Sequence, residues 1–186
     1  GAPPQAQAGV DHRVARPPVE ARKMPEVDEL LQDQALNGIK DFISKKGPYE
    51  FQAMVAALLQ GMGYHISFEA PKGRDGGIDI IAFRDPLGVE VPRIKVQVKH
   101  YQSSVGPEPI RSLKGLLNPG DEIGLFVTSG YFSNEAERFS REANVHIRLI
   151  NGDEFIGLWQ EYYDKLSDEG KNMLPLQPVY FLGGNE

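Results

Sequence analysis

The stretch that decides the fold is Gly73-Arg74-Asp75-Gly76-Gly77-Ile78-Asp79-Ile80-Ile81, followed downstream by Gln97-Val98-Lys99. Around both, apolar and polar residues alternate with a period of two, which indicates β-strands. Gln97 and Lys99 therefore share one strand face. If the two strands pair as a meander, Asp79 joins them and gathers a carboxylate, an amide oxygen and an ammonium. Burying such a cluster is costly unless a metal ion and a charged substrate compensate for it.

The composition favours one ordinary domain with an additional arm, since 186 residues can bury a sizeable core. The chain has no cysteine, which excludes disulfides and thiolate zinc sites. This fits a reducing compartment, so a cytoplasmic location is expected. No apolar run approaches the length of a membrane span and no signal peptide is visible, so no membrane partner is expected.

The charge is unevenly distributed along the chain. The net charge of −6 argues against nucleic acid as a partner. However, residues 71–114 carry eight Lys/Arg against five Asp/Glu, whereas residues 115–186 carry five against twelve. The basic excess therefore surrounds the candidate cluster, which suits phosphate binding on one side of the molecule.

The hydrophobic pattern predicts mixed helices and strands. Apolar residues at helical spacing or in period-two runs distinguish the two. Helices are expected at 26–45, 49–62, 109–117, after Ser133 and at 153–166, and strands at 64–70, 76–83, 93–101, 123–128 and 145–150. A three-strand meander followed by βαβ crossovers predicts an α/β fold: a mixed central β-sheet of about five strands, flanked by helices on both faces.

Four segments are expected along the chain. Residues 1–25 are rich in Pro, Ala and Gln without apolar periodicity, and are predicted to be a flexible arm or linker. Residues 26–46 form an N-terminal helical segment. Residues 47–168 form the main domain, and residues 169–186 are predicted to be an irregular C-terminal tail.

These residues resemble the Mrr-like restriction endonuclease catalytic domain of the PD-(D/E)xK nuclease superfamily. The resemblance covers roughly Tyr49 to Leu166 and rests on an ordered set of motifs, among them Tyr49-Glu50-Phe51, Asp75-Gly76-Gly77-Ile78-Asp79, Val96-Gln97-Val98-Lys99 and Phe126-Val127-Thr128-Ser129. The Mrr-like family has Gln where the wider superfamily has Asp or Glu, so Gln97 fits. The resemblance implies a restriction-endonuclease-like fold and an isolated catalytic domain.

The resemblance implies a Mg²⁺-dependent endodeoxyribonuclease in which Mn²⁺ can substitute. Asp79, Gln97 and the backbone carbonyl of Val98 are the implied metal ligands, and a hard cation prefers such oxygens. Lys99 would orient or deprotonate the attacking water and offset charge. Glu50 matches the family's helix glutamate, which supports the metal or positions the lysine. A glutamate in a first helical turn is equally explained by the helix dipole, so both interpretations stay open.

Candidate DNA contacts lie around this cluster. Lys72, Arg74, Lys95 and Arg111 could contact phosphate, although each alone is more often a solvated surface charge. Ser129 could bind phosphate near a helix N-terminus. His100 follows Lys99 in the strand and is expected on the opposite face, as a packed histidine.

The expected function is hydrolysis of double-stranded DNA in defence against foreign DNA. A structure-selective nuclease, such as a junction resolvase, shares the same core and remains an alternative. An inactive nuclease fold that binds DNA is a third, against which the intact Asp79, Gln97 and Lys99 argue. Two cuts on a duplex usually require two active sites, which favours a homodimer. A fused or associated DNA-reading domain is the other expected partner.

Overall fold

The structure is a computed structural model, and it describes residues 25–73 and 77–180. The predicted arm at 1–25 therefore lies outside the described residues except for its last residue. Arg74 and the end of the C-terminal tail also lie outside them.

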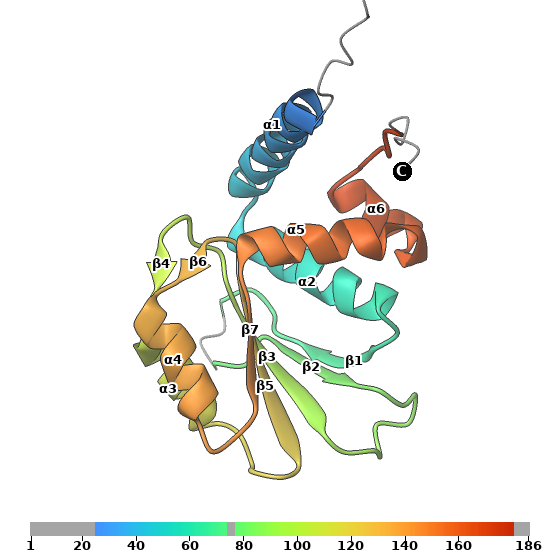
Figure 1. The fold of residues 1–186 in the computed structure, drawn as a ribbon. Helices are drawn as coiled ribbons and strands as arrows, with labels where there is room; N and C mark the ends of the chain where they lie inside the picture. Colours follow the sequence, from blue (N-terminus) through green and yellow to red (C-terminus); the bar gives the residue numbers. More distant parts are fainter. Residues whose placement is uncertain (1–24, 74–76, 181–186) are drawn as a thin grey trace, which may run out of the picture.

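A five-stranded mixed sheet forms the centre of the domain (Figure 1). Its strands are β1 (His65–Glu69), β2 (Ile80–Phe83), β3 (Arg93–Lys99), β5 (Glu122–Thr128) and β7 (Ile147–Ile150), in the spatial order β1-β2-β3-β5-β7. The first three are antiparallel neighbours, and β3, β5 and β7 run parallel. The predicted fold class, a meander that continues into parallel crossovers, is confirmed.

Helices cover both faces of this sheet. On one face, α2 (Pro48–Gly61) and α5 (Gly152–Glu161) bury a core with Ile80, Val96 and Val127. On the other face, α3 (Pro107–Lys114) and α4 (Asn134–Glu142) pack over Phe126. This second face is the one that carries Gln97 and Lys99, because Gln97 pairs with Phe126 in the parallel register.

Two differences between the predicted and observed strand ends affect the candidate site. β2 begins at Ile80, so Asp79 directly precedes the strand instead of lying within it. β3 ends at Lys99 and not at Tyr101. A short parallel ribbon that sequence patterns did not predict follows there, formed by β4 (Ser104–Val105) and β6 (Tyr131–Phe132).

The predicted N-terminal helix is present as α1 (Pro25–Ser44). Its C-terminal half carries Leu36, Ile39 and Ile43 against the core of the α2/α5 face. Figure 1 shows its N-terminal half extending away from the sheet, where Leu30 and Leu31 are exposed. None of the described helices combines the length and apolar character needed to cross a bilayer.

The prediction of an irregular tail from residue 169 is wrong for its first part. After a single 3₁₀ turn, η1 (Tyr163–Lys165), the chain forms α6 (Asp168–Met173), which Ser167 caps by accepting from Gly170 N at 3.0 Å. Leu174 is buried, and its carbonyl accepts a hydrogen bond from Trp159 Nε1. The tail therefore belongs to the core as far as Leu174, because it covers the end of α5.

Candidate active site

Asp79 is held by backbone hydrogen bonds on both sides. Its N–H donates to Val96 O in β3 at 2.8 Å, and its carbonyl accepts from Ala70 N at 2.7 Å. Asp79 thus lies between the chain leaving β1 and the middle of β3. Its backbone is fixed even though it precedes the assigned strand.

The Asp79 carboxylate reaches the edge of β3. Its Oδ2 accepts a hydrogen bond from Val98 N at 2.6 Å. Burial raises the pKa of this carboxyl above its usual value, against the Val98 hydrogen bond and the charge of Lys99, which both lower it. The structure therefore brings together Asp79, Val98 and Lys99, with the anion held at some cost in desolvation.

Gln97 contributes a buried oxygen. Its side chain is 7% exposed, and among the described residues its Oε1 has no hydrogen-bond partner. An unsatisfied buried acceptor costs about 1–3 kcal/mol, so such groups require an explanation. A cation bound next to Asp79 would supply one.

These oxygens fit a hard divalent cation. The Val98 carbonyl points to the same edge of β3 as the Val98 amide that binds Asp79, because both groups of one strand residue face the same neighbour. Within the described residues, no three His, Cys, Asp or Glu side chains form a metal-binding group. A site here would therefore depend on one carboxylate, one amide oxygen and one carbonyl, which is an oxygen-only set.

Lys99 ends β3 opposite Thr128 of β5 and is partly exposed. Among the described residues it forms no ion pair within salt-bridge distance, although its charge acts on Asp79. Its ammonium is therefore not held in a structural salt bridge by the part of the chain that the structure describes. This contrasts with Lys95, on the same strand face.

Glu50 lies in the first turn of α2 and is exposed. Its Oε2 accepts a hydrogen bond from Gly47 N at 2.5 Å, which satisfies a free amide at the start of the helix. This contact supports the interpretation in which Glu50 stabilises the start of the helix. Its supporting role in catalysis stays a prediction.

Gln52 is a residue that the sequence interpretation missed. It is 6% exposed, and its Nε2 donates to Ala70 O at 2.9 Å. Ala70 N in turn donates to Asp79 O, so Gln52 fixes the backbone that positions Asp79. A polar residue among the buried apolar positions of α2 was the available signal.

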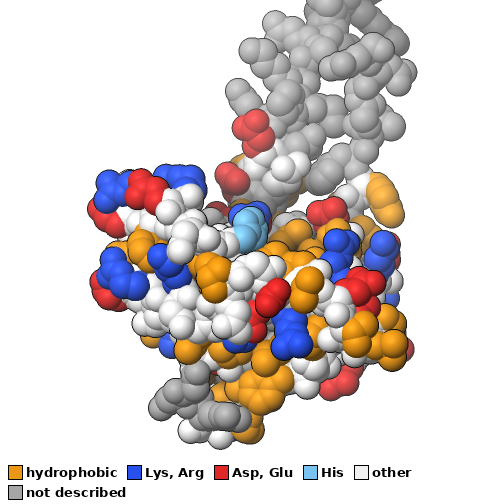
Figure 2. Space-filling model, turned by 90° about the horizontal axis from the view of Figure 1, so that it is seen from below, with side chains coloured by type: hydrophobic (Ala, Val, Ile, Leu, Met, Phe, Trp, Pro, Cys, Tyr) orange, Lys and Arg blue, Asp and Glu red, His pale blue; other side chains and the backbone are white. Residues whose placement is uncertain are grey.

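The four predicted basic contacts have different environments. Lys72 is exposed, with its ammonium 5.9 Å from the centre of the Tyr49 ring, on the segment that leads towards Asp79. Arg111 pairs with Glu108 on α3 and lies over the Phe139 ring. Arg74 lies outside the described residues. Figure 2 shows basic, acidic and apolar side chains interspersed on the face that it presents.

Lys95 is not brought to the site. Its Nζ donates to Leu116 O at 2.8 Å and pairs with Glu122 at 2.9 Å, where Lys95 is 20% and Glu122 5% exposed. It lies four residues before Lys99, or about 13 Å along the strand. Its contacts are those of a structural ion pair, so we do not retain it among the proposed phosphate contacts.

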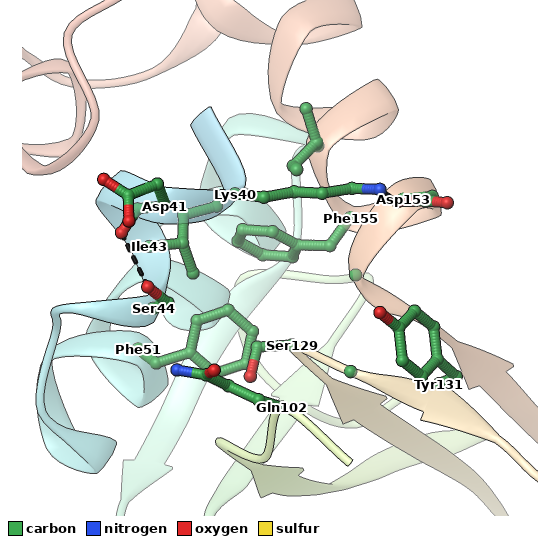
Figure 3. Close-up of a pocket in the computed structure, with 13 residues that line it drawn as sticks. Lys40, Asp41, Ile43, Ser44, Phe51, Gln102, Ser129, Tyr131, Asp153 and Phe155 are labelled. Atoms are coloured by element: carbon green, nitrogen blue, oxygen red, sulfur yellow. Dashed lines mark hydrogen bonds and ion pairs between the residues drawn. The ribbon is translucent and has the colours of Figure 1, made fainter. Parts of the chain in front are cut away.

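His100 packs on the opposite face, as predicted. Its ring stacks on Phe51 with 5.1 Å between the ring centres, and its Nδ1 lies 2.8 Å from Ser129 Oγ. Ser129 also lines a cavity of about 300 Å³ between α1, α5 and β6 (Figure 3). Neither Asp79 nor Gln97 lines this cavity, so the candidate site lies outside it.

Comparison with known proteins agrees with the fold. A family model described as restriction endonuclease, Mrr_cat, matches residues 43–159, which is more than half of the chain. No curated protein matches the chain.

Two solved structures share the fold. The chain is similar to the MspJI restriction endonuclease in complex with a 27-mer oligonucleotide, with a TM-score of 0.56 and 23% identity over 75% of this chain and 33% of that one. It is also similar to the DNA modification-dependent restriction endonuclease AspBHI, with a TM-score of 0.56 and 22% identity over 76% of this chain and 38% of that one. The chain thus spans about a third of the length of the first enzyme and 38% of the second.

Proposed function

The chain belongs to the Mrr_cat restriction endonuclease family, and from this premise we propose that it is a metal-dependent endonuclease acting on double-stranded DNA. The observation that carries the proposal is the buried Oε1 of Gln97, which has no hydrogen-bond partner among the described residues and lies one residue from the amide that binds Asp79. A carboxylate and an unsatisfied oxygen at one strand end, with Lys99 beside them, suit hydrolysis of an anionic ester better than a passive binding surface.

Asp79, Gln97 Oε1 and the Val98 carbonyl are the groups that would hold the cation. Oxygen ligands favour Mg²⁺, and Mn²⁺ is expected to substitute. When bound, such an ion lowers the pKa of a water molecule and offsets charge on the phosphate.

The chain's own residues perform the remaining tasks. Lys99 holds a positive charge at the end of β3, where it can orient the attacking water and stabilise the charge that develops on the phosphate. Asp79 supplies the carboxyl group beside it, and the hydrogen bond from Val98 N fixes the direction of that group. Lys72, Arg74 and Arg111 are the proposed contacts to flanking phosphates, which position the duplex without reading its sequence.

We place this activity in defence against foreign DNA. The related AspBHI is described as DNA modification-dependent. Because our chain spans only part of such an enzyme, we propose that a fused or associated domain selects the target. A homodimer would supply the two active sites that a double-strand cut requires.

The test is cleavage of supercoiled plasmid with Mg²⁺ or with EDTA, by the wild type and Asp79→Asn. We expect metal-dependent cleavage by the wild type and a loss of at least about 10³-fold in the variant. The control is Asp121→Asn, an exposed carboxylate before β5. Asp79→Asn should be at least as stable as the wild type without metal, since it keeps an acceptor for Val98 N and removes a desolvated charge.

A well-folded Asp79→Asn protein that cuts at the wild-type rate would refute the proposal. Cleavage of branched DNA without cleavage of linear duplex would instead establish a structure-selective nuclease. Metal-independent DNA binding without any cleavage would identify an inactive nuclease fold.

A further inference from the structure

The chain that leaves β3 is tied to one residue at the end of β5. Ser129 N donates to Lys99 O at 3.2 Å, and Ser129 Oγ donates to Tyr101 O at 3.0 Å. His100 Nδ1 lies 2.8 Å from the same Oγ. Since the single hydroxyl proton is used towards Tyr101, Nδ1 is the donor to Oγ. Three consecutive residues, beginning with Lys99, are therefore bound to Ser129.

This junction is itself anchored from two sides. The His100 ring stacks on Phe51 of α2, with 29° between the ring planes. Gly130, next to Ser129, accepts a hydrogen bond from Gly152 N at the start of α5 at 2.9 Å. A Cβ on Gly130 would lie 2.5 Å from Tyr101 O, so the two turns are in direct backbone contact.

We propose that Ser129 is a positioning residue for Lys99, with His100 as its supporting donor. This inference rests on the proposed function, in which Lys99 acts at the attacking water. Lysine carries about 2 kcal/mol of rotamer entropy, and Lys99 is the last residue of its strand. A displacement of about 1 Å in a catalytic group can cost as much as 10²-fold in rate. Fixing the backbone on the C-terminal side of its Cα therefore limits where its ammonium can go.

The sequence interpretation of Ser129 as a phosphate contact makes a different prediction. A phosphate contact strengthens DNA binding, whereas a positioning residue alters the chemical step at saturating DNA. The two are separated by measuring the single-turnover cleavage rate and the dissociation constant for duplex DNA on the same variants.

We expect Ser129→Ala to lower the single-turnover rate about tenfold, well within the limit for a misplaced catalytic group, and to leave the DNA dissociation constant unchanged. His100→Phe keeps a ring to stack on Phe51 and removes the Nδ1 donor, so a smaller rate loss is expected. Ser129→Thr keeps the hydroxyl and should therefore retain most of the wild-type single-turnover rate. Thermal melting of each variant shows whether it is folded.

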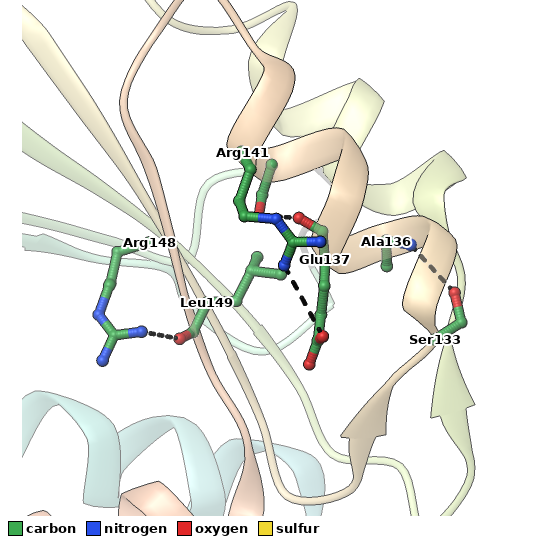
Figure 4. A network of polar contacts seen from close by, with 7 residues as sticks. Ser133, Ala136, Glu137, Arg141, Arg148 and Leu149 are labelled. Carbon is green, nitrogen blue, oxygen red and sulfur yellow. Dashed lines mark hydrogen bonds and ion pairs between the residues drawn. The ribbon is translucent and has the colours of Figure 1, made fainter.

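The matched control is Ser140→Ala, which removes the bond from Ser140 Oγ to Glu137 O at 2.9 Å on α4. Figure 4 shows the polar contacts of this helix, with its Ser133 cap and the Arg141–Glu137 pair, beside the Arg148–Leu149 hydrogen bond on β7. The rate of this variant should equal that of the wild type. Lys99→Gln is the second reference and should be inactive.

Two results would overturn this inference and leave the proposed function standing. One is a weakened dissociation constant with an unchanged rate in Ser129→Ala, which identifies a DNA contact. The other is a lowered melting temperature with an unchanged rate in both Ser129→Ala and His100→Phe, which identifies a purely structural role. Wild-type cleavage by Lys99→Gln would refute the proposed role of the lysine, and the inference would fail with it.

Discussion

Lys95, Gln97 and Lys99 lie on the same face of β3, yet each has a different environment. Lys95 lies in an ion pair with Glu122, Gln97 has a buried oxygen without a partner among the described residues, and the charge of Lys99 acts on Asp79. The difference follows from what faces each position. Glu122 and the Leu116 carbonyl meet Lys95 at one end of the strand, and Asp79 meets the other end.

The Glu122–Lys95 pair gives a pH-dependent prediction. Burial opposes ionisation of Glu122, but hydrogen bonds from Lys95 and Asn118 outweigh it, and the pKa of this carboxyl is lowered below 4.5. A lowered folded-state pKa stabilises the protein above the unfolded value, and this contribution disappears as the pH falls through the folded value. Glu122→Gln should therefore cost about 2 kcal/mol at pH 7, and the cost should shrink below pH 4.5.

Denaturant unfolding of the wild type and Glu122→Gln between pH 3 and pH 7 (about the range over which carboxylates titrate) checks this prediction. Glu142→Gln, an exposed glutamate at the end of α4, is the control and should behave as the wild type. A stability difference that is constant over this range would show that the Glu122 charge contributes nothing beyond packing. DNA binding by Glu122→Gln should be unchanged, because the pair lies away from the site.

At the element scale, the first turn of α2 presents two polar side chains in different directions. Glu50 turns back to Gly47 N, and Gln52 points inward to the Ala70 carbonyl. The helical rotation between them explains why one is exposed and the other buried. α2 thus forms one wall of the core and also fixes the segment that carries Asp79.

We expect Gln52→Leu to lower the free energy of unfolding by about 1–3 kcal/mol, because the buried Ala70 carbonyl loses its donor. Cleavage should fall more than DNA binding, since Asp79 is displaced while the surface charges are kept.

Glu50→Gln retains an oxygen for Gly47 and should lose activity only mildly. Melting curves, cleavage rates and Mg²⁺ titration of both variants test this.

Unchanged cleavage in a destabilised Gln52→Leu protein would show that the hydrogen bond between Ala70 N and Asp79 O does not position Asp79 for cleavage. If Glu50→Gln has the Mg²⁺ dependence and turnover of the wild type, Glu50 acts only at the helix terminus.

At the scale of the whole molecule, a chain of net charge −6 is proposed to bind a polyanion. The basic excess of residues 71–114 is partly consumed within the fold, because Lys95 pairs with Glu122, a carboxylate outside that stretch. The net field available to DNA is smaller than the sequence count indicates. Binding by this domain should accordingly be weak and salt-sensitive.

Lys72→Gln should reduce the slope of log affinity against log salt by about one. The reason is that binding releases about one counterion fewer when one cationic contact to phosphate is removed. Lys165→Gln, in the 3₁₀ turn after α5, is the matched control and should leave the slope unchanged. Equal slopes for the wild type and Lys72→Gln would show that Lys72 is only a solvated charge. Arg74→Gln extends the test to the neighbouring predicted contact.

The sequence by itself determined the order of the main helices and of the five strands of the mixed sheet, because alternation and helical spacing are local properties of the chain. The period-two pattern around Gln97 was enough to separate the two faces of β3, and His100 was correctly assigned to the packed face. A helix was expected directly after Ser133, and Ser133 Oγ caps that helix by accepting a hydrogen bond from Ala136 N.

Only the tertiary structure decided which polar side chains have partners. Lys95 is neutralised by Glu122, 27 positions later in the sequence, and Gln52 meets Ala70 across 18 positions. Ser129 reaches His100 across 29 positions. No local pattern encodes such pairs, since they arise from strand register and from the helix that covers each face. The same non-local packing placed Leu174 in the core, where composition alone predicted an irregular tail.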